Sequence, residues 1–153
     1  MSSREQLASS KSGYRRVIAF QRADTMAKAA YKLAQKVAGR DRWLSSQLAR
    51  AAISAPLNIV EGHSRGTTRD FLRFLETALS SISEVEYLLE FLAAAGLITQ
   101  ADIETVEPHR REAAATLTGL IKALQRKLAA DQKDWRRNLI SEDSETYGVE
   151  NAE

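Results

Sequence analysis

The sequence predicts an all-α protein, an up-down-up-down antiparallel bundle of four helices followed by an acidic C-terminal tail. Alanine and leucine are frequent and runs of β-branched residues are missing, a composition that favours helices over strands. Four long segments repeat apolar residues at alternating intervals of three and four. Short connections join these segments, so successive helices are expected to pack as antiparallel neighbours.

The chain of 153 residues is one domain by size, and its two ends differ from the rest in composition. Residues 1–13 are polar and serine-rich and are expected to form a flexible lead. Residues 14–137 are assigned to the bundle. Residues 138–153 form the tail, which is rich in acids, lacks periodicity and is expected to be disordered.

The first two helices are expected over residues 14–38 and 42–64. In the first, small and apolar side chains form one stripe, and lysines repeat every four residues on roughly the opposite side. Gly39 ends this helix, and Asp41 is the expected N-cap of the second. Pro56 lies inside the second helix, where its missing N–H group predicts a kink.

The third and fourth helices are expected over residues 67–95 and 99–137. The third carries the most regular heptad pattern in the chain and begins with a capping-box-like segment at Thr67. Thr99 is expected to start the fourth helix, and Pro108 predicts a bend or a broken first turn there.

Two polar residues, Asn58 and Glu61, lie on or near the predicted core stripe of the second helix. A buried amide needs hydrogen-bond partners, since an unsatisfied one costs about 1–3 kcal/mol. We therefore expect both side chains to bond across to neighbouring helices and to form a buried polar clamp that fixes the helix register. A catalytic pair is the alternative, but no base, nucleophile or metal ligand is spaced with these two residues.

The second helix has apolar residues on a second side, and a helix that is apolar on both sides does not suit the surface of a monomer. Its outer residues are Ile53, Leu57 and Val60, and the third helix adds Leu72 and Leu79 off its main stripe. These five residues are predicted to form a subunit interface. A covering tail is the alternative.

The net charge of +2 hides strong segregation along the chain. Residues 11–50 hold ten Lys/Arg against two acids, and residues 122–140 hold six against two. The first and fourth helices are neighbours in the predicted bundle, so their cations should form one basic face suited to phosphates. The residues hypothesised to contact phosphate are Arg22, Lys28, Lys32, Lys36, Lys122 and Arg126. A solvated face that promotes solubility is the alternative.

The sequence offers little to an enzyme. It has no cysteine and two histidines, and it lacks the Glu-x-x-His pair of di-iron bundles, the HExxH motif and a glycine-rich phosphate loop. We therefore expect no catalytic residues, no metal and no cofactor. No apolar run approaches the ~20 residues of a membrane span, so we expect a cytoplasmic protein without a membrane partner.

One combination of motifs, between residues 46 and 89, is specific enough to suggest a family. It comprises SQL and RAA within Ser46–Ala52, P-x-N-I-x-E-G at Pro56–Gly62, Arg65, and D-F-L-R-F-L-E-x-A at Asp70–Ala78. These motifs resemble the signature of the 23S rRNA intervening-sequence proteins, to which the accessory variability determinants of diversity-generating retroelements are similar. The likeness spans residues 14–128.

The resemblance implies a four-helix bundle that assembles as a homopentamer and has no known enzymatic activity. For the retroelement relatives it implies a basic surface that binds nucleic acid and a reverse transcriptase. The implied partners are thus further copies of the chain, RNA or DNA, and a reverse transcriptase or ribosomal component. The resulting hypothesis is a non-enzymatic oligomeric bundle that binds nucleic acid or a ribonucleoprotein. A protein–protein scaffold without direct nucleic-acid binding is the alternative.

Overall fold

The computed structural model describes residues 13–146, with side chains described through residue 138. This part of the chain is helical and contains no strand. Its elements are η1 (Gly13–Arg16), α2 (Ile18–Val37), α3 (Arg42–His63), α4 (Thr68–Ala94), α5 (Gln100–Glu104) and α6 (Glu107–Thr146). The prediction of an all-α fold with four long helices is confirmed. The predicted flexible lead lies outside the described residues, apart from Gly13.

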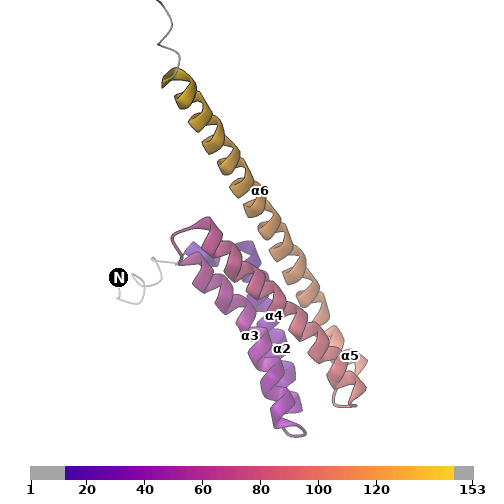
Figure 1. Cartoon of the computed structure of the whole chain (residues 1–153). Helices are drawn as coiled ribbons and strands as arrows, with labels where there is room; N and C mark the ends of the chain where they lie inside the picture. The colour runs from indigo at the N-terminus through magenta and orange to yellow at the C-terminus, as the bar shows by residue number, and fades with distance from the viewer. Residues whose placement is uncertain (1–12, 147–153) are drawn as a thin grey trace, which may run out of the picture.

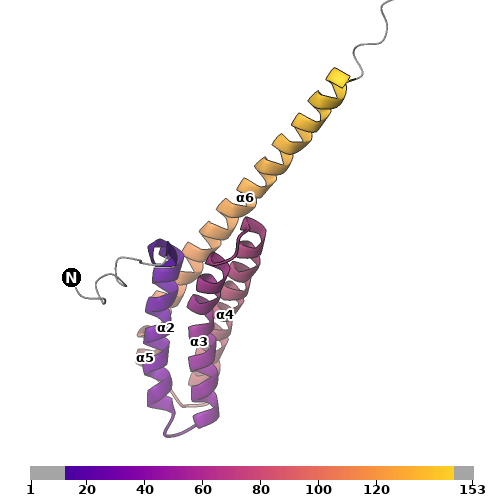
Figure 2. The ribbon, with the colours of Figure 1, turned by 90° about the vertical axis from the view of Figure 1, so that its left-hand side faces the viewer.

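The four long helices α2, α3, α4 and α6 enclose one core, in which α2 and α4 each contact both α3 and α6. Figures 1 and 2 show α6 leaving the bundle and projecting well beyond it. At one end of the bundle, Arg40 donates to the backbone oxygens of Gly96 and Leu97. Gly13 lies against His63 at the other end. The largest fully buried side chains are Met26, Leu48, Ile59, Leu75, Ile82, Leu89, Leu92 and Leu117.

The helix termini follow the signals in the sequence. Asp41 accepts a hydrogen bond from the Leu44 amide at 2.8 Å and caps α3. Thr67 caps α4, and Thr99 forms a complete capping box at the start of α5. Gly96, after the last turn of α4, has a φ of +69°, a left-handed conformation that glycine adopts without steric cost.

The close approach of α3 and α4 depends on Gly62, which is buried. A Cβ atom added here would lie 2.6 Å from the Cβ of Phe74 and 2.9 Å from Cδ2 of Phe71. Such distances are far inside van der Waals contact. Only a residue without a side chain therefore allows the two helices to pack at this spacing.

The predicted polar clamp at Asn58 and Glu61 is wrong. Asn58 is half-buried and donates back to Ser54 on its own helix, at 2.8 Å to the carbonyl oxygen. Glu61 is exposed and pairs with Arg65 one turn later. The core position is taken by Ile59, which is fully buried. The prediction failed because α3 packs against both α2 and α4. Its buried face is therefore wider than the single stripe that apolar spacing at intervals of three and four describes.

Two differences concern the last predicted helix. The chain forms the short α5 and then a new helix, with Pro108 in the first turn of α6, where its missing N–H costs nothing. The predicted broken first turn is confirmed. The predicted end of the last helix at residue 137 is too early, because α6 continues to Thr146. The rest of the tail lies outside the described residues.

Candidate nucleic-acid interface and assembly surface

All six cations proposed for phosphate contact are exposed. Three of them already have an acidic partner. Arg22 pairs with Glu112 at 3.1 Å, and Lys28 pairs with Asp24 at 2.6 Å. Lys36 binds Asp102 at 2.5 Å. The others are Lys32, Lys122 and Arg126, for which the described part of the chain shows no ion pair.

The pair between Lys36 and Asp102 is reinforced by a helix cap. The Lys36 ammonium donates to one carboxylate oxygen, and the backbone amide of Thr99 donates to the other at 2.9 Å. These hydrogen bonds, with that from Lys36 as the larger cause, lower the pKa of Asp102 to about 2. Asp102 is therefore ionised at neutral pH and holds Lys36 against α5, which leaves Lys36 less available to a phosphate.

The ion pairs also show where the proposed cations of α2 and those of α6 lie along the bundle. Arg22 lies level with Glu112, while Lys36, farther along α2, lies level with Asp102. Lys122 follows Glu112 on α6 by about 15 Å at ~1.5 Å per residue. It therefore lies beyond the start of α2, far from Lys36. The α2 lysines and the α6 cations therefore lie in two groups along the bundle, and their action as one basic face stays a prediction.

A further group of cations, which the sequence-based prediction did not include, lies at the end of the bundle where η1 meets the α3–α4 connection. Arg15 and Arg16 in η1 are exposed there, and so are Arg65, Arg69 and Arg73. Arg65 also lies over the ring of Phe74 at 4.9 Å. The signal was present as a repeat of arginine every four residues across the connection, but the acidic residues of the longer segment 51–121 concealed it in that segment's net charge.

The part of α6 that projects from this end, residues 125–137, is here called the α6 arm. It holds five Lys/Arg against two Asp, and every residue of it except Leu128 is exposed. One acid, Asp134, pairs with Arg137 at 3.6 Å. Figure 1 shows the arm standing clear of the other helices. Its cations are thus accessible from almost any direction.

The predicted subunit interface divides into two classes. Ile53 and Leu57 are 54% and 56% exposed, and they form a ridge along α3. Val60 is half-buried. Leu72 and Leu79 are partly buried against the core of their own chain, so they offer less area to a second subunit. The ridge is the part of the prediction that retains a large exposed apolar surface.

A groove of about 580 Å³ runs between α3 and α4 beside this ridge. The residues that line it are Gln47, Arg50, Ala51, Ile53, Ser54, Leu57, Asn58, Glu61, Glu84 and Leu88. A second groove, of about 980 Å³, flanks α2 and is lined by Tyr31 and Pro56 together with Lys28, Lys32 and Lys36. The first groove is lined by Glu61 and Glu84 against Arg50, and in the second the three lysines outnumber Asp24 and Asp102.

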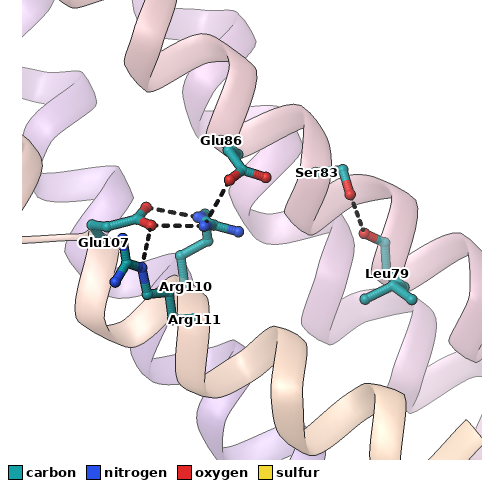
Figure 3. Close-up of polar contacts among 6 residues, drawn as sticks. All are labelled: Leu79, Ser83, Glu86, Glu107, Arg110 and Arg111. Atoms are coloured by element: carbon teal, nitrogen blue, oxygen red, sulfur yellow. Dashed lines mark hydrogen bonds and ion pairs between the residues drawn. The ribbon is translucent and has the colours of Figure 1, made fainter.

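A buried polar clamp between helices is formed by Arg110 rather than by Asn58 and Glu61, and its side chain is 9% exposed. Figure 3 shows its guanidinium between Glu107 of α6 and Glu86 of α4. Arg110 donates to both oxygens of Glu107 at 2.7 Å and to Glu86 at 2.9 Å. Arg111 approaches Glu107 from the solvent side at 2.8 Å. Glu107 therefore joins both arginines.

The hydrogen bond between Arg110 and Glu107 lowers the pKa of Glu107 and raises that of Arg110. Both groups are thus charged at neutral pH, and the cluster neutralises its own charge. Residue spacing within α6 gives no sign of the two acidic partners of Arg110, because one of them lies on another helix. The cluster has no nucleophile and no open ligand position, so we assign it to stability.

Within the part of the chain that the structure describes, no group of three His, Cys, Asp or Glu side chains is placed to hold a metal ion. No described helix has the length and apolar character needed to cross a membrane.

The sequence was compared with known proteins. The model of the family described as 23S rRNA-intervening sequence protein matches residues 15–119, which is more than half of the chain. No curated protein matches the sequence. The matched region contains α2, α3, α4 and α5 and ends inside α6. The α6 arm therefore lies beyond the matched region.

Proposed function

The chain belongs to the family of 23S rRNA-intervening sequence proteins, and we propose that it acts by binding rather than by catalysis, as a homo-oligomer that binds nucleic acid or a ribonucleoprotein. The monomer in this proposal is an antiparallel up-down-up-down bundle, and the cytoplasm is its proposed location. A pentamer is the assembly that the family resemblance implies. Reverse transcriptases and ribosomal components are the proposed protein partners on the same ground.

The observation that carries the proposal is the exposed, cation-rich α6 arm, together with Lys122 one turn before it and three exposed arginines at the adjacent end of the bundle, Arg15, Arg16 and Arg69. Cations without committed partners are the ones that can exchange solvent counterions for phosphates. On α2, Lys32 meets this condition, whereas Lys28 and Lys36 are held by acids. Assembly would repeat the basic surface in each subunit and raise its affinity through avidity.

A second candidate function is a protein–protein scaffold without direct nucleic-acid binding. Its specific support is that Arg22, Lys28 and Lys36, half of the cations first proposed for phosphate contact, are paired with acids of their own chain. Surface pairs of this kind are worth little in stability, and phosphates can compete for their cations. The scaffold predicts that removing the remaining cations leaves partner binding unchanged.

Replacing Lys32 and Lys122 with glutamate is expected to weaken binding to a labelled RNA or DNA by at least about tenfold at low salt, because two phosphate contacts become repulsive. Fluorescence anisotropy measures the change. The matched control replaces Arg42 and Arg111, which are also exposed and lie outside the α6 arm and the arginines near η1, so that the net charge changes equally. Equal losses in both variants would mean that only total charge matters. No loss in the Lys32/Lys122 variant would favour the scaffold.

A further inference from the structure

We infer that the α6 arm of one subunit docks in the groove between α3 and α4 of a second subunit. This inference rests on the proposed assembly and specifies its contact. The arm and the groove are each exposed in the single chain. The arm presents an apolar stripe flanked by cations, and the groove presents an apolar wall with acids at its edge.

On the arm, an apolar stripe continues from the core into solvent. Leu117 is fully buried and Leu124 is half-buried, and the same side of the helix then presents Leu128 and Trp135. Trp135 is 64% exposed. A stripe that keeps the core spacing after the bundle has ended predicts that another surface covers it.

On the groove, Ile53 and Leu57 form one wall, and Leu88 lies on the side of α4. Ridges of apolar side chains beside a groove are the features by which helices pack on one another. The part of α3 that lines the groove, from Gln47 to Glu61, is about 21 Å long at ~1.5 Å per residue. The stripe from Leu124 to Trp135 extends about 16 Å on the same scale, so the groove can accommodate it.

Charge decides between the two grooves. The arm carries five Lys/Arg against two Asp, and two of these cations, Lys127 and Arg136, flank the apolar stripe where they can reach acids at the edge of a groove. Glu61 and Glu84 line the α3–α4 groove, where Arg50 is the only cation among the lining residues. The groove beside α2 is lined by Lys28, Lys32 and Lys36 against Asp24 and Asp102, so its charged residues sum to +1, whereas those of the α3–α4 groove sum to −1. Complementary charge therefore favours the α3–α4 groove.

The geometry of the chain makes the occupant a second copy. Within one chain α6 packs against α2 and α4, and the arm continues the same helix away from the bundle (Figures 1 and 2). It cannot turn back to reach the groove of its own subunit. An arm-to-groove contact joins two different surfaces, and such head-to-tail contacts close into rings when the rotation allows.

Docking through the apolar stripe leaves the cations on the opposite side of the arm exposed. Arg126, Lys133 and Arg137 follow Lys122 at intervals of four, seven and four residues, which places all four on the side opposite Leu124 and Trp135. Assembly would thus present these cations outward from each subunit. The apolar side of α6 would make the oligomer, and the basic side would remain available to phosphates.

Crosslinking of single-cysteine variants tests the contact, and the absence of native cysteine makes every crosslink interpretable. Full-length Leu57→Cys protein is mixed with full-length Trp135→Cys protein that carries a mass tag, and a short bis-maleimide is added. The predicted product is the mixed dimer, in excess over both same-variant dimers. Ile53→Cys, one turn away on the ridge, provides a second position for the same test. Trp43→Cys, 68% exposed and outside the groove, is the control and should give little mixed product.

Light scattering of the wild-type chain separates the remaining outcomes. If Trp135→Cys crosslinks mainly to itself, the arms pair with each other and the inference is overturned. If the wild type is oligomeric but no mixed crosslink forms at either ridge position, the arm contact is overturned and assembly through another surface stands. A monomeric wild type would overturn both this inference and the proposed assembly.

Discussion

Replacing Gly62 with alanine is expected to lower the free energy of unfolding by about 1–3 kcal/mol, the usual cost of inserting a methyl group into a packed core. The added Cβ would lie 2.6 Å from the Cβ of Phe74. A Cβ is fixed to the backbone, so no rotamer change relieves the clash and α3 and α4 must separate. Chemical denaturation, with the two-state character checked, measures the difference.

Gly119 provides the matched control. It also lies inside a helix, α6, but an added Cβ there would meet no atom within 4 Å. Alanine at this position should stabilise the protein by about 0.5–1 kcal/mol, because glycine is the poorer helix former. Opposite signs for the two substitutions are the expected result. If Gly62→Ala proved neutral or stabilising, α3 and α4 would not approach as closely as described.

Replacing Arg110 with methionine is expected to cost about 2–4 kcal/mol, since it leaves Glu107 without its main partner in a partly buried site. Arg111→Met is the control, because Arg111 bonds the same carboxylate but its side chain is 76% exposed. The Arg111→Met substitution should lower the free energy of unfolding by no more than about 0.5 kcal/mol, as is usual for surface pairs. Similar losses from both substitutions would contradict the assignment of Arg110 as the clamp.

The pH dependence of stability gives a separate check of this cluster. Arg110 lowers the pKa of Glu107 from its ordinary value of 4.5. A carboxyl with a lowered folded pKa contributes stability above its unfolded pKa, and this contribution is lost as the pH falls through the folded value. Stability of the wild type should therefore decline below about pH 4.5. The decline should be shallower in Arg110→Met, where the contribution of Glu107 is mostly absent already.

Helix positions were predictable because they depend on neighbouring residues. Asp41, Thr67, Thr99 and Gly96 each end or begin a helix through bonds or backbone geometry within a few residues. Residue spacing also predicted the core of α4, in which Leu75, Val85 and Leu89 are buried. The buried face of α3 was misjudged because its width depends on how many helices pack against it, which spacing within one helix does not reveal.

The candidate interface was less predictable, because it depends on contacts between distant segments. Sequence identified the six cations but not the pairing of Lys36 with Asp102, which is 66 residues away. Nor could it show that η1 and the α3–α4 connection meet at one end of the bundle. The full length of α6 was missed because an acidic, aperiodic segment gives no apolar pattern to follow.

The salt dependence of nucleic-acid affinity tests the central proposal most directly. Wild-type chain is titrated into a labelled RNA and, separately, a labelled DNA at several salt concentrations. The account predicts binding at low salt and a linear fall of the logarithm of affinity with the logarithm of salt concentration. A slope of about −3 or steeper is expected for at least about four phosphate contacts. No binding at the lowest salt, or a slope near zero, would contradict the proposal.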